Sequence, residues 1–146
     1  MKKLNFSIPI NAAREKVWNV LWDDATYRKW TSVFDEGSYA VSDWEEGSKV
    51  LFLSSSGDGM YSSIERKIPY ELMAIKHNGM VKEGKELPVD EKTKDWAGAM
   101  ETYTLTEENG STKLSVEIDI TEDMQPYFND TFPKALDKVK SLAEEA

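Results

Sequence analysis

The chain opens with an alternation of apolar and polar positions. The apolar members of this alternation are Leu4, Phe6, Ile8 and Ile10. A two-residue period is typical of a strand with one face toward solvent. Pro9 has no N–H to donate, which indicates an edge strand or a bulge at that point. We therefore predict a strand over residues 4–10 at the edge of a sheet.

A helical period follows over residues 12–24. Asn11 is in position to cap this helix, because its side chain can accept from a free amide one turn on. The apolar stripe consists of Ala13, Val17, Val20 and Leu21, with Trp18 and Trp22 beside it. We expect a second short helix through Tyr27 and Trp30, capped by Asp23 or Asp24.

From Gly37 to about Ile120 the pattern is that of strands separated by turns. It predicts six antiparallel strands in a meander, over residues 38–44, 47–56, 60–68, 71–80, 99–107 and 111–120. Asn109-Gly110 is the strongest hairpin signal among the turns. Residues 82–95 carry nine charges in fourteen positions, and we expect a long exposed loop there.

The last predicted element is a long amphipathic helix. Its apolar residues keep the spacing of one helical face over four turns, from Phe128 to Ala143. Pro133 should kink this helix or mark where its straight part begins. A curved antiparallel sheet and one amphipathic helix must bury their apolar faces against each other. The predicted fold class is therefore α+β with two layers.

This order of elements resembles the helix-grip fold of the START-like superfamily, also called SRPBCC. In that fold a curved antiparallel sheet of about seven strands wraps round the long C-terminal helix, and a cavity lies between them. The stretches EKVWNVLWDDATYRKW, WEEGSKVLF, IPYELMAIKH, METYTLTEENGSTKLSVEI and FPKALDKVKSLAEE are similar to proteins homologous to the activator of the heat-shock-protein-ninety ATPase. The resemblance implies one START-like domain over residues 1–146. Its members include lipid carriers, polyketide cyclases and chaperone cofactors.

Composition excludes several classes of function. Lys and Arg number 18 against 27 Asp and Glu, a formal charge of −9, which repels nucleic-acid phosphates and anionic lipid. The chain has no cysteine, which excludes disulfides, thiolate metal sites and a Cys nucleophile. A catalytic triad or a zinc site would depend on its single histidine, His77. No apolar run approaches the length of a membrane span. We expect a cytoplasmic monomer without metal or other cofactor.

Strand parity indicates which side chains face the expected cavity. In the segment 111–120 the inward set is Leu114, Val116, Ile118 and Ile120. In the segment 71–80 the more apolar set is Met73, Ile75 and His77. The family pattern favours Val50 and Phe52 in the segment that follows Gly47.

His77 has two interpretations. It is either a side chain that fills space and is hydrogen-bonded to a neighbour, or a polar anchor or proton donor for a ligand.

Glu101 also has two interpretations. If Tyr103 and Leu105 face inward, as the resemblance suggests, Glu101 lies on the same face. Its pKa should then rise unless a partner compensates its burial, and the candidate partners are Arg66, His77 and Tyr61. In the other parity the inward residues are Met100, Thr102 and Thr104, and Glu101 is exposed.

Aromatic side chains are expected to line the rest of the cavity. Trp30, Phe34 and Trp96 are predicted near its mouth, where Trp96 is either a lid or an anchor that holds the charged loop to the core. The full set of expected ligand-binding residues is Trp30, Phe34, Phe52, Tyr61, His77, Trp96, Glu101, Tyr103, Phe128 and Phe132.

Three functions remain open, and we rank binding of a small, largely apolar molecule between sheet and final helix first. The second is a protein-partner module, as the resemblance to chaperone-ATPase activators suggests. The third is an enzyme of the cyclase or hydratase kind. In that enzyme Glu101 or His77 would be the general base, and Tyr61 or Tyr103 would stabilise an enolate.

Overall fold

The structure, a computed structural model, describes residues 2–145 apart from the side chain of Lys92. The strands are β1 (Lys2–Ile10), β2 (Tyr39–Val41), β3 (Lys49–Leu53), β4 (Gly59–Ile68), β5 (Leu72–Lys82), β6 (Lys85–Glu86), β7 (Met100–Glu108) and β8 (Ser111–Ile120). The helices are α1 (Arg14–Trp22), α2 (Asp24–Thr31), α3 (Glu91–Lys94) and α4 (Gln125–Glu144). A short 3-10 turn, Glu122–Met124, leads into α4.

All of these strands form one antiparallel sheet. Its order is β1-β8-β7-β5-β4-β3-β2, and β6 pairs with β5 at the side of this path. The six predicted strands of the meander are confirmed, and β1 adds to the sheet beside β8. Among the described strands β1 pairs with β8 alone, so Pro9 lies on an edge strand, as its sequence predicts.

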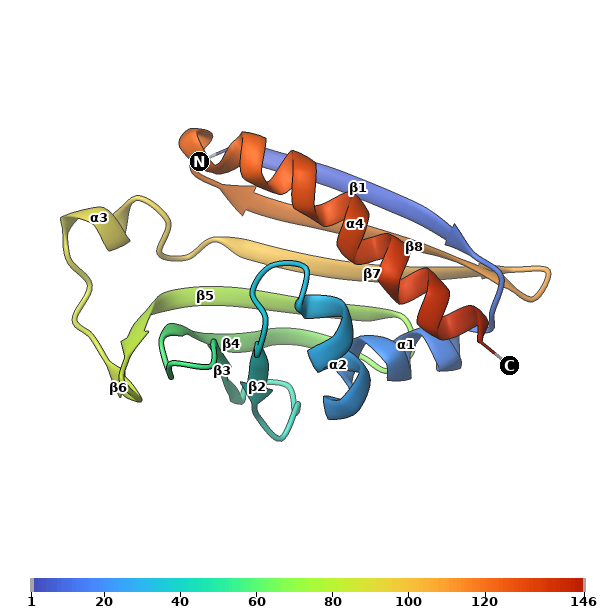
Figure 1. Ribbon diagram of the computed structural model, residues 1–146, viewed down its shortest axis with the longest axis horizontal. Coiled ribbons are helices and arrows are strands. Elements are labelled where there is room, and N and C mark those ends of the chain that lie inside the picture. Colours follow the sequence, from blue (N-terminus) through green and yellow to red (C-terminus); the bar gives the residue numbers. More distant parts are fainter. Residues whose placement is uncertain (1, 146) are drawn as a thin grey trace.

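The helices α1, α2 and α4 lie on the same face of the curved sheet (Figure 1). Helix α4 packs along β1, and α1 packs against β7 and β8. The loop from 32 to 38 crosses in front of β5, and no helix lies over the ends of β5 and β7 beyond it, toward α3 (Figure 1). We call this part the uncovered end of the concave face.

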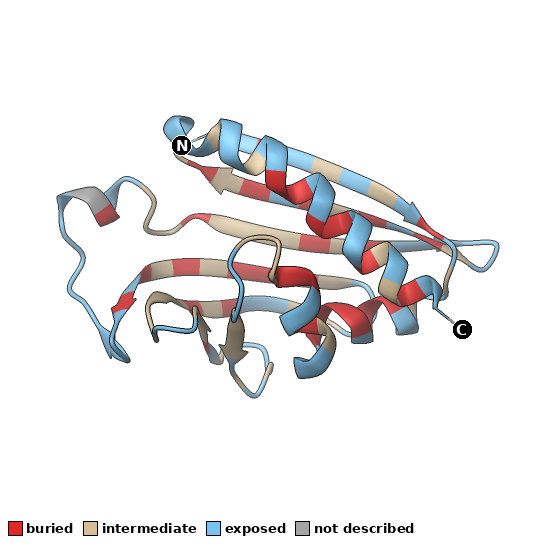
Figure 2. Ribbon diagram, viewed as in Figure 1, coloured by how far each residue is buried: buried red, intermediate tan, exposed pale blue. Residues whose placement is uncertain are grey.

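The core lies between the concave face and these helices, where buried positions of both layers meet (Figure 2). The inward set predicted for β8 is confirmed, since Leu114, Val116, Ile118 and Ile120 are all buried. Helix α4 contributes Phe132, Ala135, Leu136, Val139 and Ala143. The two-layer fold class predicted from the pattern is therefore correct.

The predicted cap of the first helix is wrong. Helix α1 begins at Arg14, and its N-cap position is Ala13, which is exposed and makes no capping hydrogen bond. Asn11 lies two residues too early to cap. Its side-chain oxygen accepts from Ser111, and its backbone N–H donates to Glu144. These contacts join the start of the helical pair to the end of α4.

Four other local predictions have mixed outcomes. Asp23 occupies the N-cap position of α2, but its side chain makes no capping hydrogen bond. Helix α4 continues through Pro133, which lies on its exposed side. Asn109 and Gly110 have φ of +54° and +81°, as a tight hairpin turn of the predicted kind requires. Most described side chains of the charged segment are exposed, but Thr93 is buried, and the segment contains β6 and α3.

Candidate functional site

Four polar side chains meet on the concave face at the margin of its uncovered end. Ser62 comes from β4, His77 from β5, and Glu101 and Tyr103 from β7. Strand register brings them together, because Ser62 pairs with His77, and Glu101 pairs with Ile75, two residues from His77. We call Ser62, His77, Glu101 and Tyr103 the polar cluster.

Hydrogen bonds connect the whole polar cluster. Ser62 Oγ lies 2.7 Å from His77 Nδ1, and His77 Nε2 lies 3.0 Å from Glu101 Oε1. The Tyr103 hydroxyl donates to the other carboxylate oxygen of Glu101. A neutral imidazole can make both of these hydrogen bonds if Ser62 donates to Nδ1 and Nε2–H donates to Glu101. The inward orientation predicted for His77 is therefore correct, and of the two orientations left open for Glu101 the inward one is present.

Glu101 is the member that solvent can reach. Its side chain is 25% exposed, whereas that of His77 is 9% exposed. Burial raises the pKa of Glu101, but the hydrogen bond and charge of His77 and the hydrogen bond from Tyr103 outweigh burial and lower it below the ordinary value of 4.5. Burial and the nearby Glu101 carboxylate raise the pKa of Tyr103 well above 10. Glu101 is thus a carboxylate beside a neutral phenol at neutral pH.

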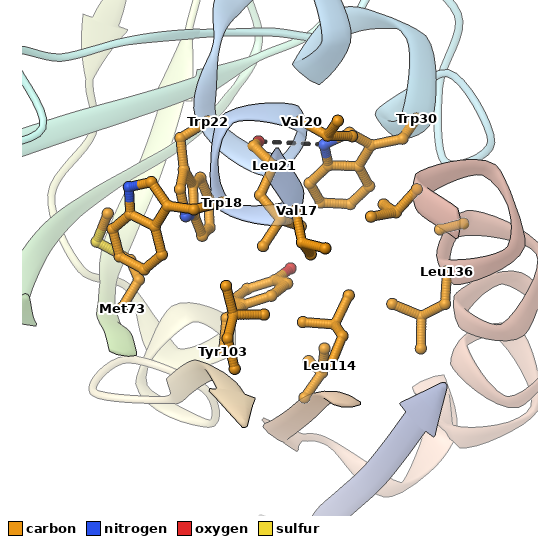
Figure 3. Close-up of a cluster of buried hydrophobic side chains, with 14 of the residues drawn as sticks. Val17, Trp18, Val20, Leu21, Trp22, Trp30, Met73, Tyr103, Leu114 and Leu136 are labelled. Carbon is orange, nitrogen blue, oxygen red and sulfur yellow. Dashed lines mark hydrogen bonds between the residues drawn. The ribbon is translucent and has the colours of Figure 1, made fainter. Parts of the chain in front are cut away.

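Aromatic rings surround this carboxylate and its donors. The Phe52 ring meets the His77 ring nearly edge-on, with centroids 5.8 Å apart. Tyr103 contacts Trp22 at 5.0 Å and Trp30 at 6.3 Å. Figure 3 shows Tyr103 among side chains of α1, β5, β8 and α4, with the Trp30 indole bonded to the Leu21 carbonyl. Apolar side chains therefore pack against the buried side of the polar cluster.

Tyr27 adds to this environment from α2. It is buried, and its ring lies 5.5 Å from Trp30 and 6.4 Å from Phe52. Burial, followed by the Glu101 charge, raises the pKa of Tyr27. Tyr27 is therefore close enough to Glu101 to sense its charge. The sequence pattern placed Tyr27 on a helix but gave no reason to assign it to the site.

Trp44 lies next to these rings in a strained backbone conformation. Its φ is +59°, a region that bulky residues rarely adopt. Ser42 Oγ accepts from its backbone N–H, and Lys67 donates to its carbonyl. This conformation brings the half-buried indole to 5.1 Å from Trp22 and 6.4 Å from Phe52. Strain of this kind is often concentrated at functional sites.

Two expected partners of Glu101 lie elsewhere. Tyr61 is on the opposite face of the sheet, where its ring packs over Gly79 and under the Lys49 ammonium. A register irregularity between Tyr61 and Ser62 accompanies this arrangement, and Ser62 takes the inward position instead. Arg66 is exposed. The partners present are His77, which was predicted, and Tyr103.

The remaining predicted residues divide into three places. Trp30 is buried in the core, and Trp96 is half-buried in the turn after α3. The other three rings form a separate aromatic group, in which Phe34 packs against Phe128 and Phe132 of α4. Phe132 fills space there, since it stacks on Phe6 with centroids 5.1 Å apart.

Two hollows on the described surface have volumes of about 330 and 460 Å³. The larger lies near Lys2 and Asp123, and the smaller lies on the outer face of β1, β7 and β8. Neither is the cavity expected between sheet and α4, which stays a prediction. Within residues 2–145, no group of three or more His, Asp or Glu side chains is placed to hold a metal ion. None of the described helices is long and apolar enough to cross a membrane.

Solved structures share this architecture. The Aha1 dimer of Colwellia psychrerythraea matches with a TM-score of 0.75 and 20% identity, over 99% of this chain and 97% of that chain. CalU16 of Micromonospora echinospora matches with a TM-score of 0.68 and 19% identity, over 97% of this chain and 74% of CalU16. DynU16, from the dynemicin biosynthetic locus, matches with a TM-score of 0.72 and 10% identity over 99% of this chain. The match spans 48% of the length of DynU16.

These likenesses, all below 25% identity, define the fold. It is the helix-grip fold, so the fold predicted by resemblance is confirmed, and Aha1 is among the proteins that share it. No family model matches the chain, and no curated protein matches it in sequence.

Proposed function

We propose that the concave face binds a small, largely apolar molecule, and that the polar cluster binds its polar group. The observation that carries this proposal is the partly exposed side chain of Glu101, whose hydrogen-bond partner His77 packs against an aromatic ring. A charge in apolar surroundings is costly to keep, and such groups are concentrated at functional sites. Two internal donors hold the Glu101 carboxylate, while part of its side chain stays open to solvent.

Aromatic area beside the cluster supports binding of the apolar body. Phe52 and Trp44 are half-buried and lie next to each other, so a ligand beside the polar cluster can cover them further. Burial of ten CH₂-sized groups contributes roughly 8 kcal/mol before the costs of association. Useful affinity therefore requires no covalent chemistry.

The same geometry favours binding over general-base catalysis. Both ring nitrogens of His77 have partners within the cluster, Ser62 and Glu101, so neither is free to take a proton from a substrate. The lowered pKa of Glu101 makes it a weak base at neutral pH. The enzyme hypothesis thus has less support than the binding hypothesis.

A neutral apolar dye such as Nile red tests the proposal with two variants of neighbouring residues. Phe52→Ala removes a ring from the concave face, and Leu51→Ala removes a side chain from the outer face of the same strand. We expect one dye per chain, an affinity about tenfold weaker in Phe52→Ala, and a change within about twofold in Leu51→Ala. Fluorescence titration measures both, with circular dichroism as the check of folding.

Equal dye binding by the two variants, or no dye binding by the unmodified protein, would contradict the proposal. Native mass spectrometry of protein purified from cells gives a second test, in which a stoichiometric small-molecule adduct is expected. The same spectrum reports the oligomeric state, which we propose is monomeric. Failure of both tests would favour a protein partner, the alternative suggested by the likeness to Aha1.

A further inference from the structure

Glu101 has acceptor capacity that the protein does not use. A carboxylate offers about four lone-pair positions, and His77 and Tyr103 occupy one on each oxygen. A quarter of the Glu101 side chain is exposed to solvent.

The charge of Glu101 also lacks a permanent counter-ion. Among the described side chains its one ion-pair partner is His77, and that pair is ionic only if the imidazole is protonated. With a neutral imidazole every hydrogen bond of the polar cluster can form, because Ser62 can donate to Nδ1 and Nε2–H can donate to Glu101. The polar cluster then carries one uncompensated negative charge.

The surroundings favour a positive group beside this charge. Electron-rich ring faces attract cations, and aromatic side chains are concentrated near Glu101, with Phe52 against His77 and with Tyr27 sensing the Glu101 charge. At longer range the chain's charge of −9 steers cations toward the protein and anions away from it.

We propose that the ligand is an organic cation, a protonated amine on an apolar body, and that its ammonium binds the free side of the Glu101 carboxylate. The ammonium donates to the unused lone pairs of Glu101, and the apolar body lies on the aromatic side chains at the uncovered end. This inference rests on the proposed binding function and specifies the ligand class.

Three compounds with the same eight-carbon chain test the inference: octylamine, 1-octanol and octanoate. The unmodified protein should bind octylammonium about tenfold more tightly than octanol, and octanoate least tightly. Tryptophan fluorescence reports the titrations, because several indoles lie near the cluster.

Two variants remove one negative charge each from the same strand. Glu101→Gln should abolish the preference for ammonium over alcohol and leave octanol binding within about twofold. Glu108→Gln, at an exposed position near the end of β7, should keep the preference, which excludes a general effect of net charge.

A further readout uses the unmodified protein and does not depend on the folding of a variant. His77 is the single histidine, so its ring protons give one identifiable set of NMR signals. Octylammonium should shift these signals in a saturable way.

The outcomes separate the two proposals. Octanol binding as tightly as octylammonium, with His77 signals unmoved by the amine, would overturn the cation and leave the binding function intact. No binding of any of the three compounds at millimolar concentration would overturn both. A preference for ammonium that persists in Glu101→Gln and disappears in Glu108→Gln would assign the cation to another surface, and so overturn the inference.

Discussion

Glu101 keeps its charge in the folded protein because His77 and Tyr103 both donate to it. These hydrogen bonds, with the charge of His77 when it is protonated, lower its pKa although burial acts in the opposite direction. In the unfolded chain Glu101 has its ordinary pKa of 4.5. As pH falls, Glu101 is therefore protonated at a higher pH in the unfolded chain than in the folded protein. Lowering the pH thus lowers the free energy of unfolding.

This difference predicts a distinct acid dependence for Glu101→Gln. The contribution of Glu101 is fully present above pH of about 4.5 and is lost as pH falls through the lower folded-state pKa. From about pH 5 to pH 3, the Tm of the unmodified protein should therefore fall more steeply than that of Glu101→Gln. Thermal unfolding by circular dichroism measures this, with Glu108→Gln as control. Parallel curves for the unmodified protein and Glu101→Gln would be inconsistent with a lowered pKa.

Alternation along the strands was sufficient to predict the inward orientation of His77, but it left the orientation of Glu101 open between the two faces of the strand. It did not identify Ser62, because a serine in a strand is not distinctive until its partner is known. The inclusion of Tyr61 in the site was wrong. Alternation counted back from the buried Ile64 selects Ser62 for the inward face and leaves Tyr61 on the other. The contribution of Trp44 depends on a left-handed backbone conformation that no period reveals.

At the level of elements, the closest approach is between β3 and β4 beside the site. Gly59 pairs with Leu53, and a Cβ at Gly59 would lie 1.8 Å from the carbonyl oxygen of Phe52. Backbone at that distance cannot move aside without disturbing the pairing of the two strands. Position 59 therefore requires glycine, because a Cβ there would overlap the backbone of β3.

Substitution of Gly59 by alanine should destabilise the protein by about 3 kcal/mol, because the added methyl group overlaps the backbone of β3. Gly110→Ala is the control, since a Cβ there meets nothing within 4 Å and only the φ of +81° opposes it. That cost is about 1 kcal/mol. Urea denaturation compares the two, and a smaller loss in Gly59→Ala than in Gly110→Ala would refute the argument.

Long periodic elements were predictable, and short ones were not. Strand β8 and helix α4 each repeat one pattern over many residues, so a single atypical residue such as Pro133 does not obscure them. The two residues of β6 and the four of α3 are too few to show a period. The start of α1 was misplaced because Asn11 makes tertiary contacts instead of a cap.

Across the whole molecule, Phe132 joins parts that are far apart in sequence. It is buried in α4, stacks on Phe6 of β1, and meets Phe34 at a centroid distance of 5.1 Å. The final helix, the first strand and the loop that crosses the concave face therefore share one aromatic contact. Only the fold brings these three together, although the sequence predicted an apolar face for the strand and the helix and placed Phe34 at the mouth of the cavity.

Phe132→Ala should therefore cost about 4 kcal/mol, the usual range for a buried aromatic side chain. Phe128→Ala, one turn earlier and only half-buried, should cost about 1 kcal/mol. Equilibrium unfolding in urea measures both free energies. Similar losses in the two variants would show that Phe132 does not have this joining function.

The two outer strands of the sheet influence how the protein behaves in a crowded solution. Strand β2 has only three residues. Strand β1 contains Pro9, which has no N–H to donate to a strand of another molecule, and Lys2 and Lys3 lie near its start. Short or charged margins of this kind discourage intermolecular β-pairing. Aggregation through either edge is thereby suppressed, without any helix or loop having to cover these strands.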